Sequence, residues 1–134
     1  CLIEPEKKEA IEYRLKEAEE SLQDALSLYN NKRYRSAVNR AYYSMFYSAL
    51  ALLENKGLKN SKHIGVISFF DKEYIKTNIF SKIHSKALHK AFELRQEADY
   101  SILVELEVDE VTEIINQAQN FVKQVRDYIM EYLF

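Results

Sequence analysis

Hydrophobic side chains recur every three or four residues along most of this chain, with charged residues between them. The first such run follows Pro5 and comprises Ile11, Leu15, Ala18, Leu22, Ala25 and Tyr29. This spacing places the apolar side chains on one face of an α-helix. Pro5 suits the first turn, where its missing N–H is not needed, so we expect a helix from Pro5 to the pair Asn30–Asn31.

A second helix is predicted from about Tyr34 to Lys56, with Gly57 at its end, because glycine readily adopts the left-handed conformation that ends many helices. Its apolar positions cover more than half of its circumference and are Ala37, Val38, Ala41, Tyr42, Met45, Phe46, Ala49, Leu50, Leu52 and Leu53. A helix that is apolar on so many sides contacts several neighbours, so we expect it at the centre of the fold.

Three more helices are predicted in the second half of the chain. One runs from about Lys62 to Thr77 with Ser61 as its cap, and its apolar positions are Ile64, Ile67, Phe70 and Tyr74. The next runs from about Ser81 to Ala98, with Ile83, Ala87, Ala91 and Leu94. Residues 99–108 are expected to connect it to a last helix, which Asp109 caps and which carries Val111, Ile114, Ala118, Phe121, Val125 and Tyr128.

The composition favours helices as well. Of the 134 residues, 47% are hydrophobic, but only two are glycine and one is proline, too few for the many turns of an all-β domain. We therefore expect residues 1–134 to form one all-α domain, an up-and-down bundle of four or five helices. The longest fully apolar run, Ala49 to Leu53, is too short to cross a membrane, and Cys1 has no partner cysteine, so we expect a cytoplasmic protein.

The net charge of −2 argues against a large basic surface for duplex DNA but leaves room for a small basic pocket. One face of the second predicted helix offers such a pocket, and it carries Arg33, Ser36, Arg40, Tyr43 and Tyr47. Guanidinium, hydroxyl and phenol groups on one stripe can hold phosphates and stack bases. In the alternative interpretation, Arg40 pairs with a carboxylate of a neighbouring helix and the tyrosines only pack.

Other candidate residues lie on the third and fourth predicted helices. Lys62 and His63 begin the third helix, where backbone N–H groups favour a phosphate. Arg95 and Asp99 are four residues apart, and His84 lies on roughly the same face. A histidine can activate a ribose 2′-hydroxyl and an arginine can stabilise the phosphorane, although an ordinary ion pair and a surface histidine explain the same residues. Because the three histidines are scattered and no glycine-rich phosphate loop is present, we predict neither a metal nor a cofactor.

Three segments together resemble a known family. They are Ser36–Leu53 (SAVNRAYYSMFYSALALL), Lys62–Phe70 (KHIGVISFF) and Ala91–Tyr100 (AFELRQEADY). In this order and spacing they resemble HEPN domains, specifically the small prokaryotic branch labelled UPF0332, over about residues 8 to 130. The resemblance implies a helical bundle that forms a dimer and is encoded beside a minimal nucleotidyltransferase, often as a toxin–antitoxin pair.

The resemblance also implies a site, because many HEPN proteins are metal-independent RNases with an arginine followed a few residues later by a histidine at the dimer interface. Arg95 matches the arginine, but Tyr100, Ser101 and Ile102 stand where the histidine is expected. A carboxylate near the scissile phosphate repels it, and a phenol is a poor base at neutral pH. The resemblance therefore favours binding of RNA or a nucleotide; an active RNase toxin and a pure interaction module are the alternatives.

We expect the polar face of the second helix to meet the end of the fourth in one polar cluster, with Asp99 as the counter-ion between two arginines. The candidate catalytic residues are Arg95, Asp99 and Tyr100. The candidate ligand-binding residues are Arg40, Tyr43, Lys62 and His63. The expected partners are a second copy of this chain, a nucleotidyltransferase, and RNA or a nucleotide; no membrane is expected.

Overall fold

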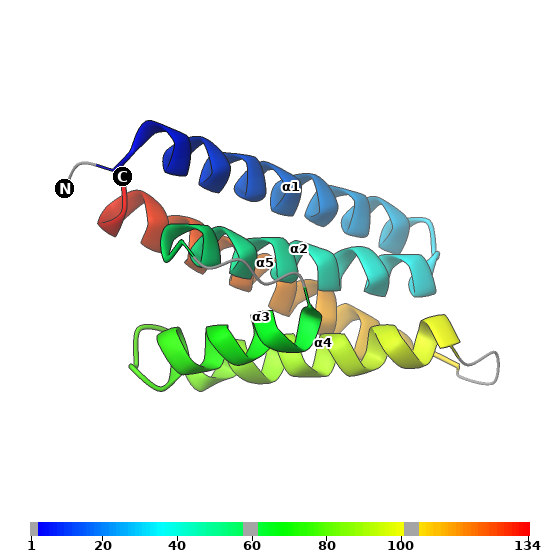
Figure 1. Ribbon diagram of the computed structural model, residues 1–134. Coiled ribbons are helices and arrows are strands. Elements are labelled where there is room, and N and C mark those ends of the chain that lie inside the picture. Colours follow the sequence, from blue (N-terminus) through cyan, green and yellow to red (C-terminus); the bar gives the residue numbers. More distant parts are fainter. Residues whose placement is uncertain (1–2, 58–61, 101–104) are drawn as a thin grey trace.

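The computed structural model describes residues 3–57, 62–100 and 105–134, which form helices without any strand (Figure 1). The elements are α1 (Pro5–Asn30), α2 (Tyr34–Asn55), α3 (His63–Phe70), a π-helical segment η1 (Asp71–Ile75), α4 (Lys82–Tyr100) and α5 (Val108–Tyr132). The predicted all-α helical bundle is confirmed, and the predicted bounds of the first two helices are correct to about one residue. The predicted cap Ser61 and part of the predicted connection, residues 101–104, lie outside the described residues.

The helix α2 forms the centre of the bundle. Figure 1 shows α1 and α2 side by side in one half of the molecule, α3 and α4 in the other, and α5 behind them. Accordingly, α2 contacts α1, α3, α4 and α5. Thirteen of its 22 residues are buried, among them Ser44 and Ser48, whose hydroxyls donate to helix carbonyl groups. The central position predicted from its wide apolar surface is confirmed.

Consecutive helices run in opposite directions, except that α3 runs in the same direction as α2 (Figure 1). As a result, the first residue of α3 lies beside the middle of α2 instead of its end. A hydrogen bond between His63 of α3 and Tyr42 of α2 marks this position. The offset matters for function, because it brings the start of α3 next to the polar face of α2.

Two of the predicted core positions are wrong, since Ile64 is 71% exposed and Ile83 is 60% exposed. In α3 the buried residues are Val66, Ile67, Phe69 and Phe70. In α4 they are His84, Ala87, Leu88, Ala91, Leu94 and Ala98. Spacings of three and four continue on either side of an apolar stripe, so an isoleucine at its edge can face the core or the solvent with the same sequence pattern.

The third predicted helix is not a continuous α-helix. At Asp71 it widens into η1, where the Lys76 N–H donates to the Asp71 carbonyl over 2.9 Å. The Asp71 carboxylate accepts hydrogen bonds from the hydroxyl of Ser85 and from Nε2 of His89, both 2.7 Å long. These bonds attach the π-helical segment to α4. Hydrophobic periodicity does not reveal such a segment, because only one extra residue enters the turn.

Of two predicted helix ends, the structure confirms one and contradicts the other. Gly57 has a φ of 70°, the left-handed conformation predicted for the end of α2. By contrast, α5 begins at Val108 with Glu107 in the cap position, so Asp109 lies in the first turn and is not the cap. There its carboxylate still interacts favourably with the positive end of the helix dipole. None of the helices in the described residues has the length and apolarity needed to cross a bilayer.

Candidate ligand-binding site

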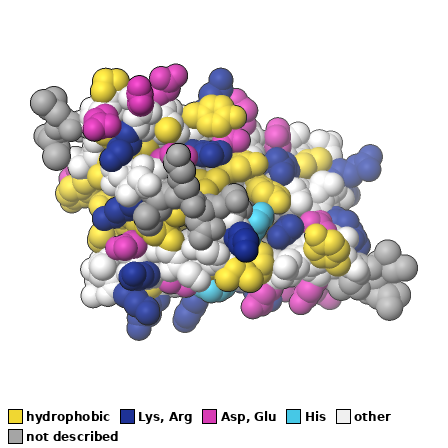
Figure 2. Space-filling view, in the orientation of Figure 1, with side chains coloured by type: hydrophobic (Ala, Val, Ile, Leu, Met, Phe, Trp, Pro, Cys, Tyr) yellow, Lys and Arg dark blue, Asp and Glu magenta, His cyan; other side chains and the backbone are white. Residues whose placement is uncertain are grey.

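Polar and aromatic residues from α2, α3 and α4 meet on one face of the bundle, and we call them the arginine cluster. Its members are Asn39, Arg40, Tyr42, Tyr43, Phe46, His63, Phe92, Arg95 and Asp99. Figure 2 shows a histidine in the middle of this face with Lys or Arg side chains on either side of it, where α3 begins. Three helices therefore build this site from segments that are far apart in the sequence.

The side chain of Arg95 lies among aromatic rings. Its guanidinium carbon is 5.1 Å from the ring centre of Tyr42, 5.8 Å from that of Tyr43 and 5.6 Å from that of Phe92. Only 11% of the side chain is exposed, and the nearest carboxylate oxygen, on Asp99, is 3.6 Å away. Its Nε is buried and has no hydrogen-bond partner among the described residues. Aromatic faces offset part of the cost of burying this charge, but they accept no strong hydrogen bond.

Arg40 reaches the same place from α2. Its guanidinium carbon is 5.0 Å from the ring centre of Tyr43, so both arginines lie against one tyrosine ring. Arg40 Nε donates to Asn39 Oδ1 over 3.1 Å, and Asn39 Nδ2 reaches Asp99 Oδ2 at 3.5 Å. Arg40, Tyr43, Arg95 and Asp99 thus meet as the sequence predicts. The predicted direct contact of Asp99 with both arginines does not occur, because Asn39 stands between Arg40 and the carboxylate.

His63 belongs to the same cluster, although no sequence pattern places it beside Arg95. Its Nδ1 is 2.7 Å from the hydroxyl of Tyr42, and its ring stacks on Phe46 with the ring centres 4.3 Å apart. Burial, assisted by the positive charge of Arg95, lowers the pKa of His63 below its ordinary value. Burial also raises the pKa of Tyr42, while the charge of Arg95 opposes this rise. At neutral pH, a neutral imidazole and a protonated phenol therefore lie beside the cation.

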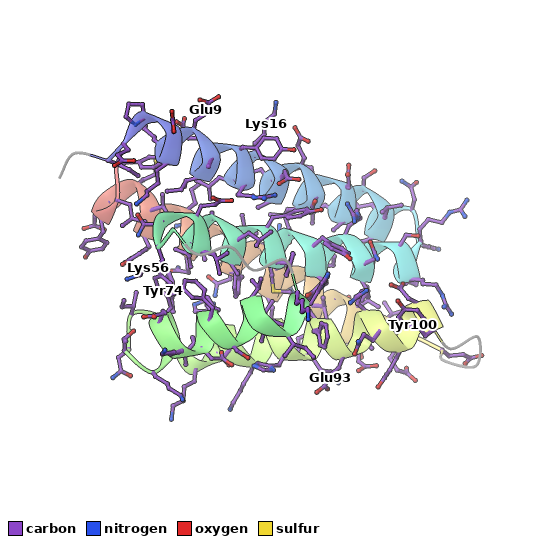
Figure 3. The ribbon with its side chains drawn as sticks, in the orientation of Figure 1. Glu9, Lys16, Lys56, Tyr74, Glu93 and Tyr100 are labelled. Carbon is purple, nitrogen blue, oxygen red and sulfur yellow. The ribbon has the colours of Figure 1, made fainter. Side chains whose placement is uncertain are left out.

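Two predicted site residues lie at the edge of the cluster or outside it. Tyr100 is 81% exposed at the end of α4 (Figure 3) and makes no hydrogen bond or ring contact with the described residues. Lys62 is exposed and precedes His63 at the start of α3. His84, which the sequence placed on the face of Arg95, is instead buried against Phe80 and Phe121. Eleven residues of helix, about 16 Å, separate it from Arg95.

Sequence reasoning missed the residues that support the two arginines. Tyr42 and Phe46 belong to the apolar face of α2, and Phe92 and Asn39 follow no pattern that marks a site. A tyrosine with a buried ring and a bonded hydroxyl has the same periodicity as a phenylalanine of the core. Only the offset position of α3, which brings His63 to Tyr42, reveals that this hydroxyl is part of a polar site.

An open cavity of about 420 Å³ continues the arginine cluster toward the start of α2. Its walls are Leu28, Arg35, Ser36, Asn39, Arg40 and Asp99. Among the described residues, no three His, Cys, Asp or Glu side chains come together in a way that could hold a metal ion. Two arginines and a hydroxyl in this wall, beside the ring faces of the arginine cluster, suit an anion that carries an aromatic group.

The family model for the HEPN domain matches residues 11–128 of this chain. The chain belongs to the HEPN domain family. This HEPN chain is similar to the UPF0332 protein of Thermotoga maritima, with 43% identity over 124 residues that cover 92% of this chain and 94% of that protein. The resemblance noted from three sequence segments is thereby confirmed.

Two relatives from Methanocaldococcus jannaschii carry names that refer to an activity. "Putative toxin MJ0605" is 37% identical over 133 residues, 99% of this chain and 98% of that protein. "Putative toxin MJ0142" is 35% identical over 129 residues, 96% of this chain and 88% of that protein.

Proposed function

We propose that this HEPN protein works as part of a toxin–antitoxin type system and binds a phosphate group of RNA or of a nucleotide at the arginine cluster, together with a nucleotidyltransferase partner. Two relatives named as toxins match nearly the whole chain, which supports the biological setting. The nucleotidyltransferase is the partner that the resemblance to UPF0332 proteins implies. Exposed apolar side chains such as Ile64 and Ile83 offer contact area for that partner or for a second copy of the chain.

One observation carries this proposal: aromatic rings, more than carboxylates, hold Arg95 in place. Three aromatic rings surround the guanidinium, its one carboxylate contact is long, and its Nε lacks a partner among the described residues. A structural ion pair would neutralise the charge with short hydrogen bonds. Arg40, Arg95 and Asp99 together carry a net charge of +1, enough to attract one phosphate. Apart from Arg40 Nε, which donates to Asn39, and the buried Nε of Arg95, the N–H groups of the two guanidiniums make no short hydrogen bond with the described residues that would compete with a ligand.

The test is to replace Arg95 with methionine and to measure binding of a fluorescent RNA and of a nucleotide by anisotropy. Methionine keeps most of the apolar stem that packs on the rings, so the protein should stay folded with a melting temperature only a few degrees lower. Loss of a charge-assisted contact to phosphate should weaken binding at least about tenfold. Arg126→Met is the matched control, because Arg126 is exposed on α5 and pairs with Glu19. Equal affinities for both variants would refute the proposal.

The partner is tested separately. Co-expression with the nucleotidyltransferase encoded beside this chain, where there is one, should yield a complex on affinity purification. Ile64→Glu places a charge on a strongly exposed apolar position without touching the core, and Lys16→Glu, on the exposed side of α1, is its control. A purified complex that contains another protein, and no nucleotidyltransferase from the same operon, would argue for a pure interaction module.

A second candidate function, a metal-independent RNase, is favoured by the position of His63 beside Arg95. The histidine that the family motif places after Arg95 is absent, but His63 brings an imidazole of lowered pKa to the same guanidinium from α3. For catalysis, Nδ1–H would donate to the Tyr42 oxygen and leave Nε2 free to take the proton of a ribose 2′-hydroxyl. The 2′-oxygen then attacks the phosphorus and Arg95 stabilises the phosphorane; the P–O5′ bond breaks and the 5′-oxygen takes a proton from water.

This chemistry yields a 2′,3′-cyclic phosphate and a 5′-hydroxyl end without a metal ion. Cleavage of RNA in the presence of EDTA, with these ends identified by mass spectrometry, supports the second candidate. His63→Gln should abolish the cleavage, whereas the matched change His89→Gln, at a histidine bonded to Asp71, should not. Binding of RNA without any cleavage leaves the first proposal as the function.

A further inference from the structure

The charges of this chain are divided between its helices in a way that the net charge of −2 conceals. Residues 25–53 contain no Asp or Glu at all, and their basic residues are Lys32, Arg33, Arg35 and Arg40. Residues 1–24 carry eight acidic and four basic residues, and residues 105–134 carry seven acidic and two basic residues. Figure 2 shows acidic side chains gathered along α1 at the upper edge of the molecule. Residues 25–53 therefore favour a polyanion, whereas α1 and α5 repel it.

The open cavity at the start of α2 has the composition of a second phosphate site. Arg35 and Ser36 line it and are exposed, and Arg35 forms no ion pair or hydrogen bond with the described residues. The one carboxylate in its wall belongs to Asp99, which reaches Asn39 and Arg95. Arg35, Arg40, Arg95 and Asp99 together carry a net charge of +2, more than one phosphate monoanion needs.

The distance between the two sites suits neighbouring phosphates of one strand. Arg35 and Arg40 are five residues apart on α2, about 7.5 Å along the helix axis. Arg40 and Asn39 belong both to the cavity wall and to the arginine cluster, so no protein segment separates the two sites. A single nucleotide with one phosphate cannot occupy both, whereas a strand can.

Ring faces lie beside this path along α2. Tyr43 and Tyr47 are partly exposed, and their ring centres are 5.7 Å apart. Partly exposed Phe92 and His63 lie close by, with ring centres 6.3 Å apart. Bases stack on such rings readily only in a single strand, because in a duplex the faces of each base are covered by the neighbouring base pairs. The same rings give no advantage to an acidic polypeptide.

We propose that the ligand of this protein is a single-stranded RNA that lies along α2, with one phosphate at Arg40 and Arg95 and the next at Arg35 and Ser36, and with an unpaired base on Tyr43 and Tyr47. This inference rests on the proposed function, since it uses the arginine cluster as its first phosphate site. It goes further in choosing a strand over a free nucleotide and in assigning Arg35 and Ser36 to a second subsite.

The experiment compares three labelled ligands by anisotropy: uridine monophosphate, a single-stranded RNA of about eight nucleotides, and a duplex of the same length. The wild-type chain should bind the single strand more tightly than either of the others. Arg35→Ala should reduce the ratio of single-strand affinity to mononucleotide affinity about tenfold. It should also lower the slope of log affinity against log salt concentration by about 0.7, the value for one lost phosphate contact on a single strand. Arg126→Ala is the matched control and should leave both quantities unchanged.

The outcomes separate this inference from the proposal on which it rests. If Arg95→Met has no effect on any ligand, the arginine cluster is not the site and the proposed function fails. If Arg95→Met weakens binding but Arg35→Ala changes neither the affinity ratio nor the salt slope, the second subsite is refuted while the proposed function stands. Equal binding of duplex and single strand refutes the stacking of an unpaired base. Competition by polyglutamate as strong as that by RNA would show that the surface recognises an acidic protein instead.

Discussion

Asp99 should oppose ligand binding while it supports the fold, and Asp99→Asn tests both effects with one substitution. Its carboxylate is 3.6 Å from the Arg95 guanidinium. A phosphate that contacts Arg95 would lie roughly 6 Å from this carboxylate, and Coulomb's law at a dielectric constant of about 40 to 80 gives a repulsion of about 0.7–1.4 kcal/mol. Removing the negative charge should therefore tighten phosphate binding about three- to tenfold.

The same change should weaken the fold slightly. The pair is partly exposed and its contact is long, so its loss is worth about 0.5–1 kcal/mol. That loss lowers the melting temperature by about 3 °C in a chain of this size. Asparagine keeps the shape of the side chain and still accepts a hydrogen bond from Asn39, which limits other disturbances.

Anisotropy measures the affinity, and a thermal melt followed by circular dichroism measures the stability of the same preparation. A residue that only supports the structure would lose affinity and stability together, whereas the electrostatic argument requires opposite signs. The Lys123 partner Asp127, exposed on α5, provides the control Asp127→Asn, which should leave the affinity unchanged. Unchanged or weaker binding by folded Asp99→Asn protein would refute the reasoning.

The buried histidines, the left-handed glycine and the expected dimer each give a further prediction. Burial lowers the pKa of His63 and of His84, so the unfolded chain takes up protons before the folded chain does as the pH falls through 6.5. The free energy of unfolding, measured by urea titration, should therefore be full above this pH and decline below it. An increase toward pH 5.5 would contradict this. Gly57→Ala, at a φ of 70° with open space around it, should lose about 1 kcal/mol in a urea titration from backbone strain alone, while Gly57→Asn should lose less. Light scattering at micromolar concentration should give about twice the chain mass of 15.8 kDa, and a monomer mass would rule out the homodimer.

Sequence patterns identified the helices well because periodicity reflects burial, and burial dominates the fold. The central position of α2 followed from its wide apolar surface, and Gly57 marked its end. Predictions failed at the edges of the apolar stripes, where Ile64 and Ile83 turned out exposed and His84 buried. There the decision depends on which neighbouring helix covers the edge, and that information is not local to the helix.

Sequence patterns also predicted part of the candidate site, because helix periodicity shows which residues lie at the polar edge of each helix. Arg40, Tyr43, Arg95 and Asp99 could be joined because each lies on the polar edge of a helix whose apolar face was recognised. His63 could not be joined to them, because its place depends on α3 running in the same direction as α2 and starting at its middle. No spacing within α3 or α2 encodes that arrangement.

The rings around Arg95 explain how a chain with more acidic than basic residues can keep a cation available for a ligand. A carboxylate at hydrogen-bond distance would hold the guanidinium and neutralise it, so an anion would have to displace it. Tyr42, Tyr43 and Phe92 fix the same group through the negative faces of their rings, which are too weak to saturate its donors. Asp99 is near enough to reduce the repulsion between the two arginines but too distant to occupy their N–H groups. The aromatic surplus near the middle of α2 thus serves the site as well as the core, because it positions charge without cancelling it.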